Sequence, residues 1–291
     1  MRIFLAQSFG LCFGVRDAIA QAERLASQEP LTILGELVHN PIVRERLHRQ
    51  GIAEGSLDNR RSASRRVMIT AHGASDRKRT EWGAAGFEIA DATCPLVQHA
   101  HEQLKRLVAA GFFPVVIGQP GHVEVNGLIE DFPDGVVVSG HEDVAGLPQQ
   151  QRYGIISQTT QPIDFVRGIV GLIRQAHPRA EVRFVDTVCK PTKERQSALE
   201  ELITNTDGIV VVGGRTSNNT RQLVETCRAA GKKAFHVERP DDLRPEWFAG
   251  IRTVGLTGGT STLPETVRAV EERLKEISHL LNSNLRNKPS T

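Results

Sequence analysis

Several features are scarce or missing in this sequence of 291 residues. No apolar run approaches the roughly 20 residues that a membrane-spanning helix needs. The N-terminal apolar stretch is broken by Gln7, Ser8 and Gly10, and no cleavage site of small residues follows it. A formal net charge of only +2 argues against an extended nucleic-acid-binding surface. We therefore expect a cytoplasmic protein with no membrane span and no nucleic-acid partner.

Cysteine is also scarce, because the chain has four cysteines and no C-x-x-C pair. This number and spacing do not make the disulfide framework of a small secreted domain. The sequence also lacks the G-x-G-x-x-G fingerprint of dinucleotide-binding proteins. The cysteines are therefore expected either to pack in the core or to bind a soft metal.

A threefold internal pattern is the most informative feature that the sequence does have. An apolar strand-like segment, a cysteine and a helical pattern follow one another around Cys12, Cys94 and Cys189. A strand-like segment ending in glycine comes 23 or 24 residues after each cysteine. A third apolar segment with a polar turn completes each unit, as VMITAHGAS, YGIISQTTQ and TVGLTGGTST.

This alternation predicts an α/β fold of parallel sheets with crossover helices. We expect three pseudo-equivalent units around a central cavity, because functional loops gather beyond the carboxyl ends of parallel strands. The predicted units are residues 13–94, 95–189 and 190–281, with the N-terminal strand 1–12 in the third and a flexible tail over 282–291.

The repeat gives Cys12, Cys94 and Cys189 equivalent places, each at the start of a predicted helix. Such places favour the thiolate, which is the metal-binding form of cysteine. Their separation matches neither a zinc finger nor a ferredoxin motif. Buried packing, a plain zinc site and an iron–sulfur centre all stay open at this point, and in a 4Fe–4S centre three thiolates would leave one iron without a protein ligand. Cys227 lies inside an amphipathic pattern and is assigned to the core.

Polar residues follow the apolar segments and form a candidate cradle for an anionic group such as diphosphate. They are His39, His72, His122, Thr159, Ser217, Asn218, Asn219 and Ser261. Taken singly, the histidines could also be surface residues, and the Ser and Asn residues could be helix N-caps. The remaining histidines are assigned no functional role. Glu124, two residues after His122, is the candidate general acid, although an ordinary surface carboxylate is the alternative.

Nine ordered motifs spread over residues 1–280 resemble the 4-hydroxy-3-methylbut-2-enyl diphosphate reductases of the non-mevalonate isoprenoid pathway. These motifs are GLCFGV, GELVHN, AHG, DATCPLV, GHVEVNG, SQTT, VCKPTKERQ, VVGGRTSNN and GLTGGTST. Three departures from the family pattern stand out: Val123 replaces the usual proline, Asn218 a common serine, and Gln98-His99 the usual Thr-Lys pair. Val123 is expected to change only loop stiffness, and none of the departures removes a predicted cluster ligand.

The resemblance implies one 4Fe–4S cluster with three cysteine ligands, Cys12, Cys94 and Cys189. It implies that the histidines and the Ser and Asn residues named above hold the substrate diphosphate. By the same resemblance, Thr159 helps to hold the substrate alcohol and Glu124 relays protons. The implied reaction is a two-electron reductive dehydroxylation that gives isopentenyl and dimethylallyl diphosphates.

Two electrons are needed, and the missing dinucleotide fingerprint points to an external donor such as ferredoxin or flavodoxin. Two rival functions remain open at the level of sequence. One is a non-redox iron–sulfur hydratase or dehydratase, and the other is a non-enzymatic iron–sulfur carrier or sensor. Activity without a reductant would indicate the first, and transferable iron without diphosphate affinity the second.

Overall fold

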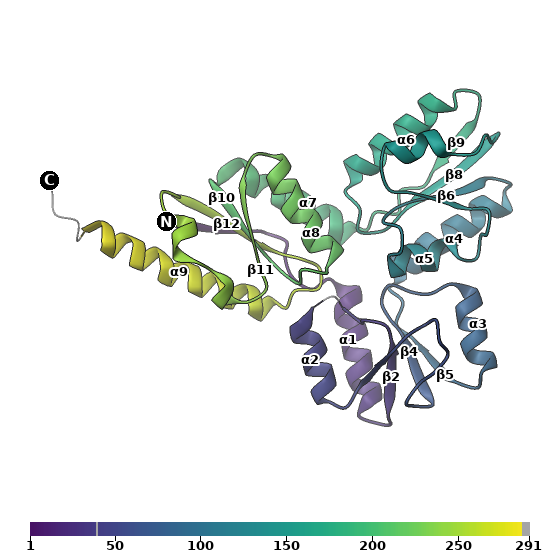
Figure 1. Ribbon diagram of the computed structural model, residues 1–291, viewed down its shortest axis with the longest axis horizontal. Helices are drawn as coiled ribbons and strands as arrows, with labels where there is room; N and C mark the ends of the chain where they lie inside the picture. Colours follow the sequence, from purple (N-terminus) through teal and green to yellow (C-terminus); the bar gives the residue numbers. More distant parts are fainter. Residues whose placement is uncertain (39, 287–291) are drawn as a thin grey trace. The chain divides into compact units, whose positions relative to one another are not determined.

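The computed structural model describes residues 1–38 and 40–286. These residues form three parallel sheets of four strands each (Figure 1). The described chain divides into two compact units. One contains residues 1–12, 40–43 and those from 193 onward, and the other contains residues 13–38 and 44–192.

The first sheet lies in the unit that contains residues 44–192. Its strands, in spatial order, are β3 (Ala53–Gly55), β2 (Leu31–Leu34), β4 (Arg66–Ile69) and β5 (Glu88–Asp91). The helices adjoining these strands in sequence are α1 (Phe13–Ala26), α2 (Pro41–Arg49) and α3 (Asp76–Ala84). The central strands are almost continuously buried, as expected where helices cover both faces of a parallel sheet.

The second sheet belongs to the same unit and repeats the same order of strands. It consists of β7 (Val136–Val138), β6 (Phe113–Ile117), β8 (Arg152–Ser157) and β9 (Glu181–Phe184). Its helices are α4 (Pro95–Ala109), α5 (Val123–Ile129) and α6 (Ile163–Ala176), with a 3-10 turn, η1 (Glu142–Gly146).

The third sheet is built in the other unit, and the N-terminal strand is one of its edges. Its strands are β1 (Arg2–Leu5), β12 (Thr253–Gly258), β10 (Gly208–Val212) and β11 (Lys233–Val237). The helices are α7 (Lys190–Asn205), α8 (Asn218–Ala229) and α9 (Pro264–Arg286), with 3-10 turns η2 (Pro240–Asp242) and η3 (Pro245–Phe248). Helix α9 thus continues beyond residue 281, after which the sequence predicted a flexible tail, to Arg286.

The three sheets confirm the predicted α/β class and the threefold pattern. The predicted glycine-ended strands are β2, β6 and β10, and the strands with polar turns are β4, β8 and β12. The sequence pattern missed the fourth strand of each sheet, namely β3, β7 and β11. Two of these have only three residues, too short to show a clear period of two. The arrangement of the units around one cavity stays a prediction.

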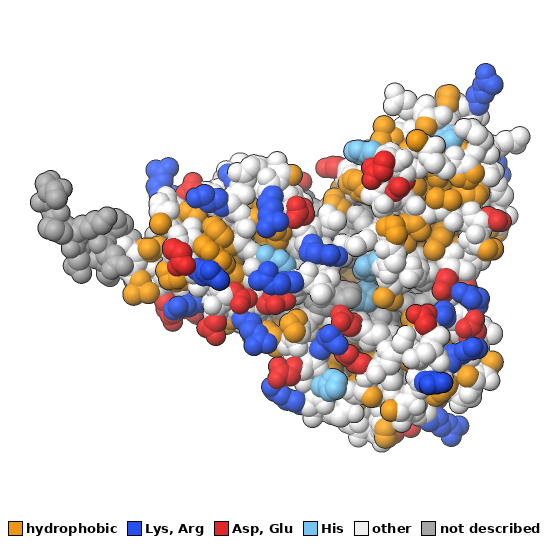
Figure 2. Space-filling model, in the orientation of Figure 1, with side chains coloured by type: hydrophobic (Ala, Val, Ile, Leu, Met, Phe, Trp, Pro, Cys, Tyr) orange, Lys and Arg blue, Asp and Glu red, His pale blue; other side chains and the backbone are white. Residues whose placement is uncertain are grey.

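The surface carries charges of both signs. On the face drawn in Figure 2, Lys and Arg side chains are interspersed with Asp and Glu side chains. Arg44, for example, pairs with both Glu36 and Glu54. None of the described helices combines the length and apolar character that a bilayer span requires.

Glycine in the middle of β8 allows close packing between that strand and α4. A Cβ atom on Gly154 would lie 2.8 Å from Cβ of Phe112 and 2.9 Å from Cβ of Leu107. By contrast, Gly168 on the exposed side of α6 has no atom within 4 Å of such a Cβ. Replacing each of these two glycines by alanine should therefore change the free energy of unfolding in opposite directions.

We predict that Gly154→Ala lowers the free energy of unfolding by about 1–3 kcal/mol, because the added methyl group overpacks the core. Gly168→Ala should raise it by roughly 0.5–1 kcal/mol, because alanine restricts the unfolded chain and suits a helix. Urea denaturation of the two variants measures both changes. Equal effects of the two substitutions would contradict the packing described for β8.

Candidate functional site

Each of the three predicted ligand cysteines lies directly before a helix. Cys12 precedes α1, Cys94 is the N-cap of α4, and Cys189 precedes α7. Each cysteine amide also donates a hydrogen bond to the carbonyl group two residues beyond the end of the neighbouring strand. These bonds run from Cys12 to Thr260 (3.2 Å), from Cys94 to Ala71 (3.0 Å) and from Cys189 to Thr159 (2.9 Å). The three cysteines are therefore structurally equivalent, as the repeat predicted.

The three thiols differ from the fourth in exposure. Cys12, Cys94 and Cys189 form no disulfide and are partly exposed, whereas Cys227 is fully buried. Burial raises the pKa of Cys227 to about 12, so this thiol stays protonated in the core. Free, accessible thiols at helix N-termini are suited to binding iron in a sulfide cluster. Cys12 belongs to one compact unit and the other two to the second, and their meeting at one cluster stays a prediction.

The backbone leaves room for the Cys94 thiol. A Cβ atom on Gly14, in the first turn of α1, would lie only 2.5 Å from Sγ of Cys94. Any larger residue at position 14 would occupy the space of the thiol. The glycine of the GLCFGV motif therefore gives Cys94 the space that it needs.

An aspartate three residues before the cysteine organises two of the cysteine loops. Oδ1 of Asp91 accepts from the amide of Thr93 (2.9 Å), and Oδ1 of Asp186 accepts from the amide of Val188 (3.1 Å). Sequence reasoning missed this role. The spacing D-x-x-C before Cys94 and Cys189 was the signal that could have revealed it.

Two of the predicted histidines lie close together. His72 is in the loop after β4, and His122 is the N-cap of α5; their rings meet edge to face at 5.6 Å. Nδ1 of His122 accepts a hydrogen bond from the amide of Glu124 (3.1 Å). The neutral ring therefore carries its proton on Nε2, where it can donate to an anion. The third predicted histidine, His39, lies outside the described residues.

Glu124 and Thr159, distant in sequence, are direct partners. The amide of Thr159 donates to Oε1 of Glu124 at 2.6 Å, and its carbonyl accepts from Cys189. Burial raises the pKa of Glu124 to about 7, although hydrogen bonds from Thr159 oppose this rise. The surface alternative for Glu124 is therefore wrong, because the side chain is only 2% exposed. Thr159 links a buried acid to a cysteine loop.

The other compact unit holds the remaining predicted residues, in the loops after β10 and β12 and in the first turn of α8. Ser217 is the N-cap of α8, and Oδ1 of Asn219 accepts from the amide of Thr260 at 2.9 Å. Nδ2 of Asn218 and Oγ of Ser261 are buried and have no hydrogen-bond partner within the described chain. Buried donors of this kind are normally satisfied, which marks these two as groups that can receive a ligand.

Asn40 is a further residue that the sequence analysis did not single out. Its Oδ1 accepts from the amides of Ile42 (2.9 Å) and Val43 (3.3 Å), and its Nδ2 donates to the carbonyl of Ser261 at 2.7 Å. The side chain therefore caps α2 and holds the backbone beside the Ser261 hydroxyl. Its place at the end of the GELVHN motif, directly after His39, was the available signal.

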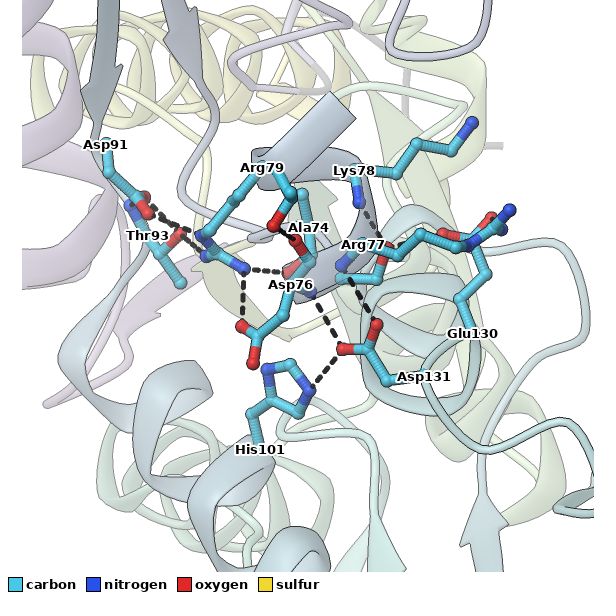
Figure 3. A network of polar contacts seen from close by, with 12 residues as sticks. Ala74, Asp76, Arg77, Lys78, Arg79, Asp91, Thr93, His101, Glu130 and Asp131 are labelled. Carbon is cyan, nitrogen blue, oxygen red and sulfur yellow. Dashed lines mark hydrogen bonds and ion pairs between the residues drawn. The ribbon is translucent and has the colours of Figure 1, made fainter. Parts of the chain in front are cut away.

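A polar network connects the elements that carry His72, His122 and Cys94 (Figure 3). The Asp131 carboxylate, just beyond α5, accepts from the amides of Asp76 (2.8 Å) and Arg77 (3.1 Å) at the start of α3. Nε2 of His101, on α4, lies 3.1 Å from Oδ2 of Asp131. This is within ion-pair distance, but the two groups are not aligned as a hydrogen bond requires. Burial lowers the pKa of His101, which favours its neutral form. The network is thus a structural support on one side of the site.

The positions that depart from the family pattern all have a clear place. Val123 is the first residue of α5, a position that also suits proline. Gln98 and His99 are exposed on α4. Asn218 replaces a hydroxyl donor by an amide donor in the buried loop described above.

The sequence profile of the LytB protein family matches residues 3–275. A 4-hydroxy-3-methylbut-2-enyl diphosphate reductase of Pelobacter propionicus is 36% identical over 281 residues, covering 96% of this chain and 99% of the relative. The reductase of Aquifex aeolicus is 33% identical and covers 94% of this chain and 96% of its own length.

Two solved structures have the same fold. The E-1-hydroxy-2-methyl-but-2-enyl-4-diphosphate reductase from Plasmodium falciparum gives a TM-score of 0.88 at 26% identity, covering 94% of this chain and 88% of that one. The second is a structure of (E)-4-hydroxy-3-methyl-but-2-enyl diphosphate reductase, the terminal enzyme of the non-mevalonate pathway. It gives a TM-score of 0.67 at 32% identity, and the match covers 95% of this chain and 100% of that one. From its profile, its relatives and its fold, the chain belongs to the LytB protein family.

Proposed function

We propose that this chain is a 4-hydroxy-3-methylbut-2-enyl diphosphate reductase. It reduces (E)-4-hydroxy-3-methylbut-2-enyl diphosphate with two electrons and two protons to isopentenyl and dimethylallyl diphosphates, releasing water. The observation that carries the proposal is the buried Glu124 carboxyl group, bonded to Thr159, whose carbonyl in turn holds the Cys189 loop. Through Thr159 alone, the carboxyl group that we propose as proton donor is connected to the loop of a proposed cluster ligand.

Cys12, Cys94 and Cys189 would hold the 4Fe–4S cluster. The fit rests on three partly exposed thiols outside any disulfide, at equivalent helix starts, and on the space that Gly14 leaves beside Cys94. With three protein ligands, such a cluster supplies electrons and an iron that can act as a Lewis acid toward the substrate hydroxyl group. The protein's part is to fix the ligand loops, and the equivalent amide-to-carbonyl bonds do so.

Glu124 would move the protons. A carboxyl group with a pKa of about 7 can both release and regain a proton near neutral pH. One proton converts the departing hydroxyl into water, and the second goes to a carbon of the allyl unit. Thr159, in contact with the same carboxyl, would orient the alcohol end of the substrate.

The diphosphate would be held by donors from the loops described above. Asn218 and Ser261 contribute buried donors that lack a partner in the described chain, and His122 contributes its Nε2 proton. Ser217 accepts a bond from the amide of Thr220 as an N-cap, and its hydroxyl proton can still be donated. His72 and Asn219 complete this set, and His39 remains a prediction from the sequence.

The electrons would come from a separate small redox protein, a ferredoxin or a flavodoxin. The sequence offers no dinucleotide fingerprint from which the enzyme could take a hydride itself. A non-redox hydratase would have no use for such a donor, and a cluster carrier would have no use for the buried Glu124.

We predict that Glu124→Gln lowers reductase turnover by about 10²-fold or more, because the amide cannot deliver a proton. The assay is anaerobic reduction of the substrate by the chemically reduced holoenzyme, with identification of both products. Iron content and substrate binding should stay as in wild type. Unchanged turnover would exclude the proton relay, and wild-type activity without reductant would favour the hydratase.

The titration of Glu124 gives a second prediction. Because its pKa rises from 4.5 to about 7 in the folded state, its stabilising contribution is complete below pH 4.5 and is lost as the pH rises through 7. Relative to Glu124→Gln, wild type should therefore lose roughly 3 kcal/mol of unfolding free energy between pH 4.5 and pH 8. Urea denaturation of the cluster-free proteins measures this, with Glu200→Gln on the exposed side of α7 as control. Parallel curves for wild type and Glu124→Gln would be inconsistent with the raised pKa.

The diphosphate donors give a third prediction. Asn218→Ala and Ser261→Ala should each raise KM about tenfold or more, since each removes a hydrogen bond worth about 1.5–3 kcal/mol to a charged group. Steady-state kinetics on the holoenzyme measure this change. Thr226→Ala, on the exposed side of α8, is the matched control and should leave KM unchanged. If both test variants keep the wild-type KM, neither Asn218 nor Ser261 binds the diphosphate.

A further inference from the structure

The guanidinium group of Arg79 contacts two different loops of the first sheet. Arg79 lies on α3, and its Nε donates to Oδ2 of Asp91 (2.8 Å) while its Nη2 donates to Oγ1 of Thr93 (3.0 Å). Its Nη1 donates to the carbonyl of Ala74. Figure 3 shows Arg79 between Asp91 and Thr93 on one side and Ala74 on the other. One side chain therefore bridges the loops that follow β4 and β5.

Each of these loops carries a predicted site residue close to the arginine. Ala74 comes two residues after His72, and Thr93 comes directly before Cys94. The loops also touch each other without the arginine. Gly73 has a φ of +78°, and a Cβ atom on it would lie 3.0 Å from Cγ2 of Thr93. The loop that carries His72 and the loop that carries Cys94 are thus in direct contact, and Arg79 donates hydrogen bonds to both of them.

The chemistry of the three acceptors requires an arginine. A planar guanidinium group presents donors in fixed directions, so it can bind a carboxylate, a hydroxyl and a carbonyl at the same time. Asp91 is engaged on both sides, because its Oδ1 accepts from Thr93 and its Oδ2 from Arg79. The side chain of Arg79 is 24% exposed; its bond to Asp91 lies at the surface, whereas its bonds to Ala74 and Thr93 are partly buried.

We propose that Arg79 is a positioning residue of the reductase, which fixes the His72 loop and the Cys94 loop relative to each other. This inference rests on the proposed function for the roles of the two loops. Loss of the guanidinium group leaves the fold of the sheet in place but lets the diphosphate ligand and the cluster ligand move independently. The effect should therefore appear in substrate affinity and in the cluster itself.

The same pair of strands supplies a matched control. Arg66 opens β4, its partner Glu88 opens β5, and the two residues are paired in register. Arg66 binds Glu88 and Glu29 with a side chain about as buried as that of Arg79. It lies at the amino ends of the strands, whereas Arg79 bridges the loops at their carboxyl ends. Arg66→Met therefore removes a comparable ion pair from the sheet without touching either loop.

The test compares Arg79→Met, Arg79→Lys and Arg66→Met as anaerobically purified holoenzymes. Arg79→Met should raise KM at least tenfold, weaken the binding of inorganic pyrophosphate by a similar factor and change the electron paramagnetic resonance spectrum of the reduced cluster. Arg79→Lys should recover part of each loss. Arg66→Met should keep the wild-type KM, pyrophosphate affinity and spectrum, even if its melting temperature falls as much as that of Arg79→Met.

The proposal is overturned if Arg79→Met matches Arg66→Met in KM, pyrophosphate affinity and spectrum. Should Arg79→Met not fold, Asp91→Asn replaces it, since the amide oxygen can still accept from Thr93 while the amide nitrogen cannot accept from Arg79. Wild-type behaviour of Asp91→Asn would overturn the proposal equally. Inactive wild-type enzyme would instead contradict the proposed function, and the binding and spectroscopic comparison would still decide the role of Arg79.

Discussion

Neighbouring strands run parallel throughout the three described sheets, and the position of every candidate site residue depends on this direction. In a parallel sheet all strands end at the same edge, so the loops that leave them lie side by side. The three cysteines, His72, His122, Ser217 and Ser261 lie in such loops, and Asn218 and Asn219 open the helix that follows β10. Antiparallel pairing would have sent alternate loops to the opposite edge and separated the loops after β4 and β5, which are in contact here.

Within this arrangement, burial divides the polar residues by task. Glu124 is almost fully enclosed, which keeps its proton available near neutral pH. Asn218 and Ser261 are enclosed without a partner in the described chain, so their donors are available for the proposed diphosphate. Asn40, Asp91 and Asp186 are instead occupied by bonds within the protein, and they hold loops in place. A buried donor without a partner in the described chain thus differs from a group whose bonds are satisfied there, and Glu124 lies between the two because its carboxyl accepts from Thr159.

The fold and the structural equivalence of the three cysteines were predictable from sequence because the repeat made the pattern visible three times. Cys12, Cys94 and Cys189 each follow an apolar segment and open a helix, so three weak signals added up. The partnership of Glu124 with Thr159 was not predictable from these patterns, because it joins two different loops through tertiary structure. Arg79 escaped notice for a similar reason: on α3 it reads as an ordinary surface charge, and only the folded chain brings Asp91 and Ala74 to it.

In each repeat a backbone carbonyl group holds the amide of the cysteine, and this has a consequence for how the repeats could diverge. The carbonyl acceptors belong to Ala71, Thr159 and Thr260, and a carbonyl accepts equally well whatever side chain its residue carries. A mutation at any of these positions can therefore alter what the loop recognises without loosening the adjacent thiol. The three repeats can therefore carry different side chains at this position while the carbonyl bond is kept. Thr159 also contacts Glu124, whereas Ala71 contributes its backbone carbonyl.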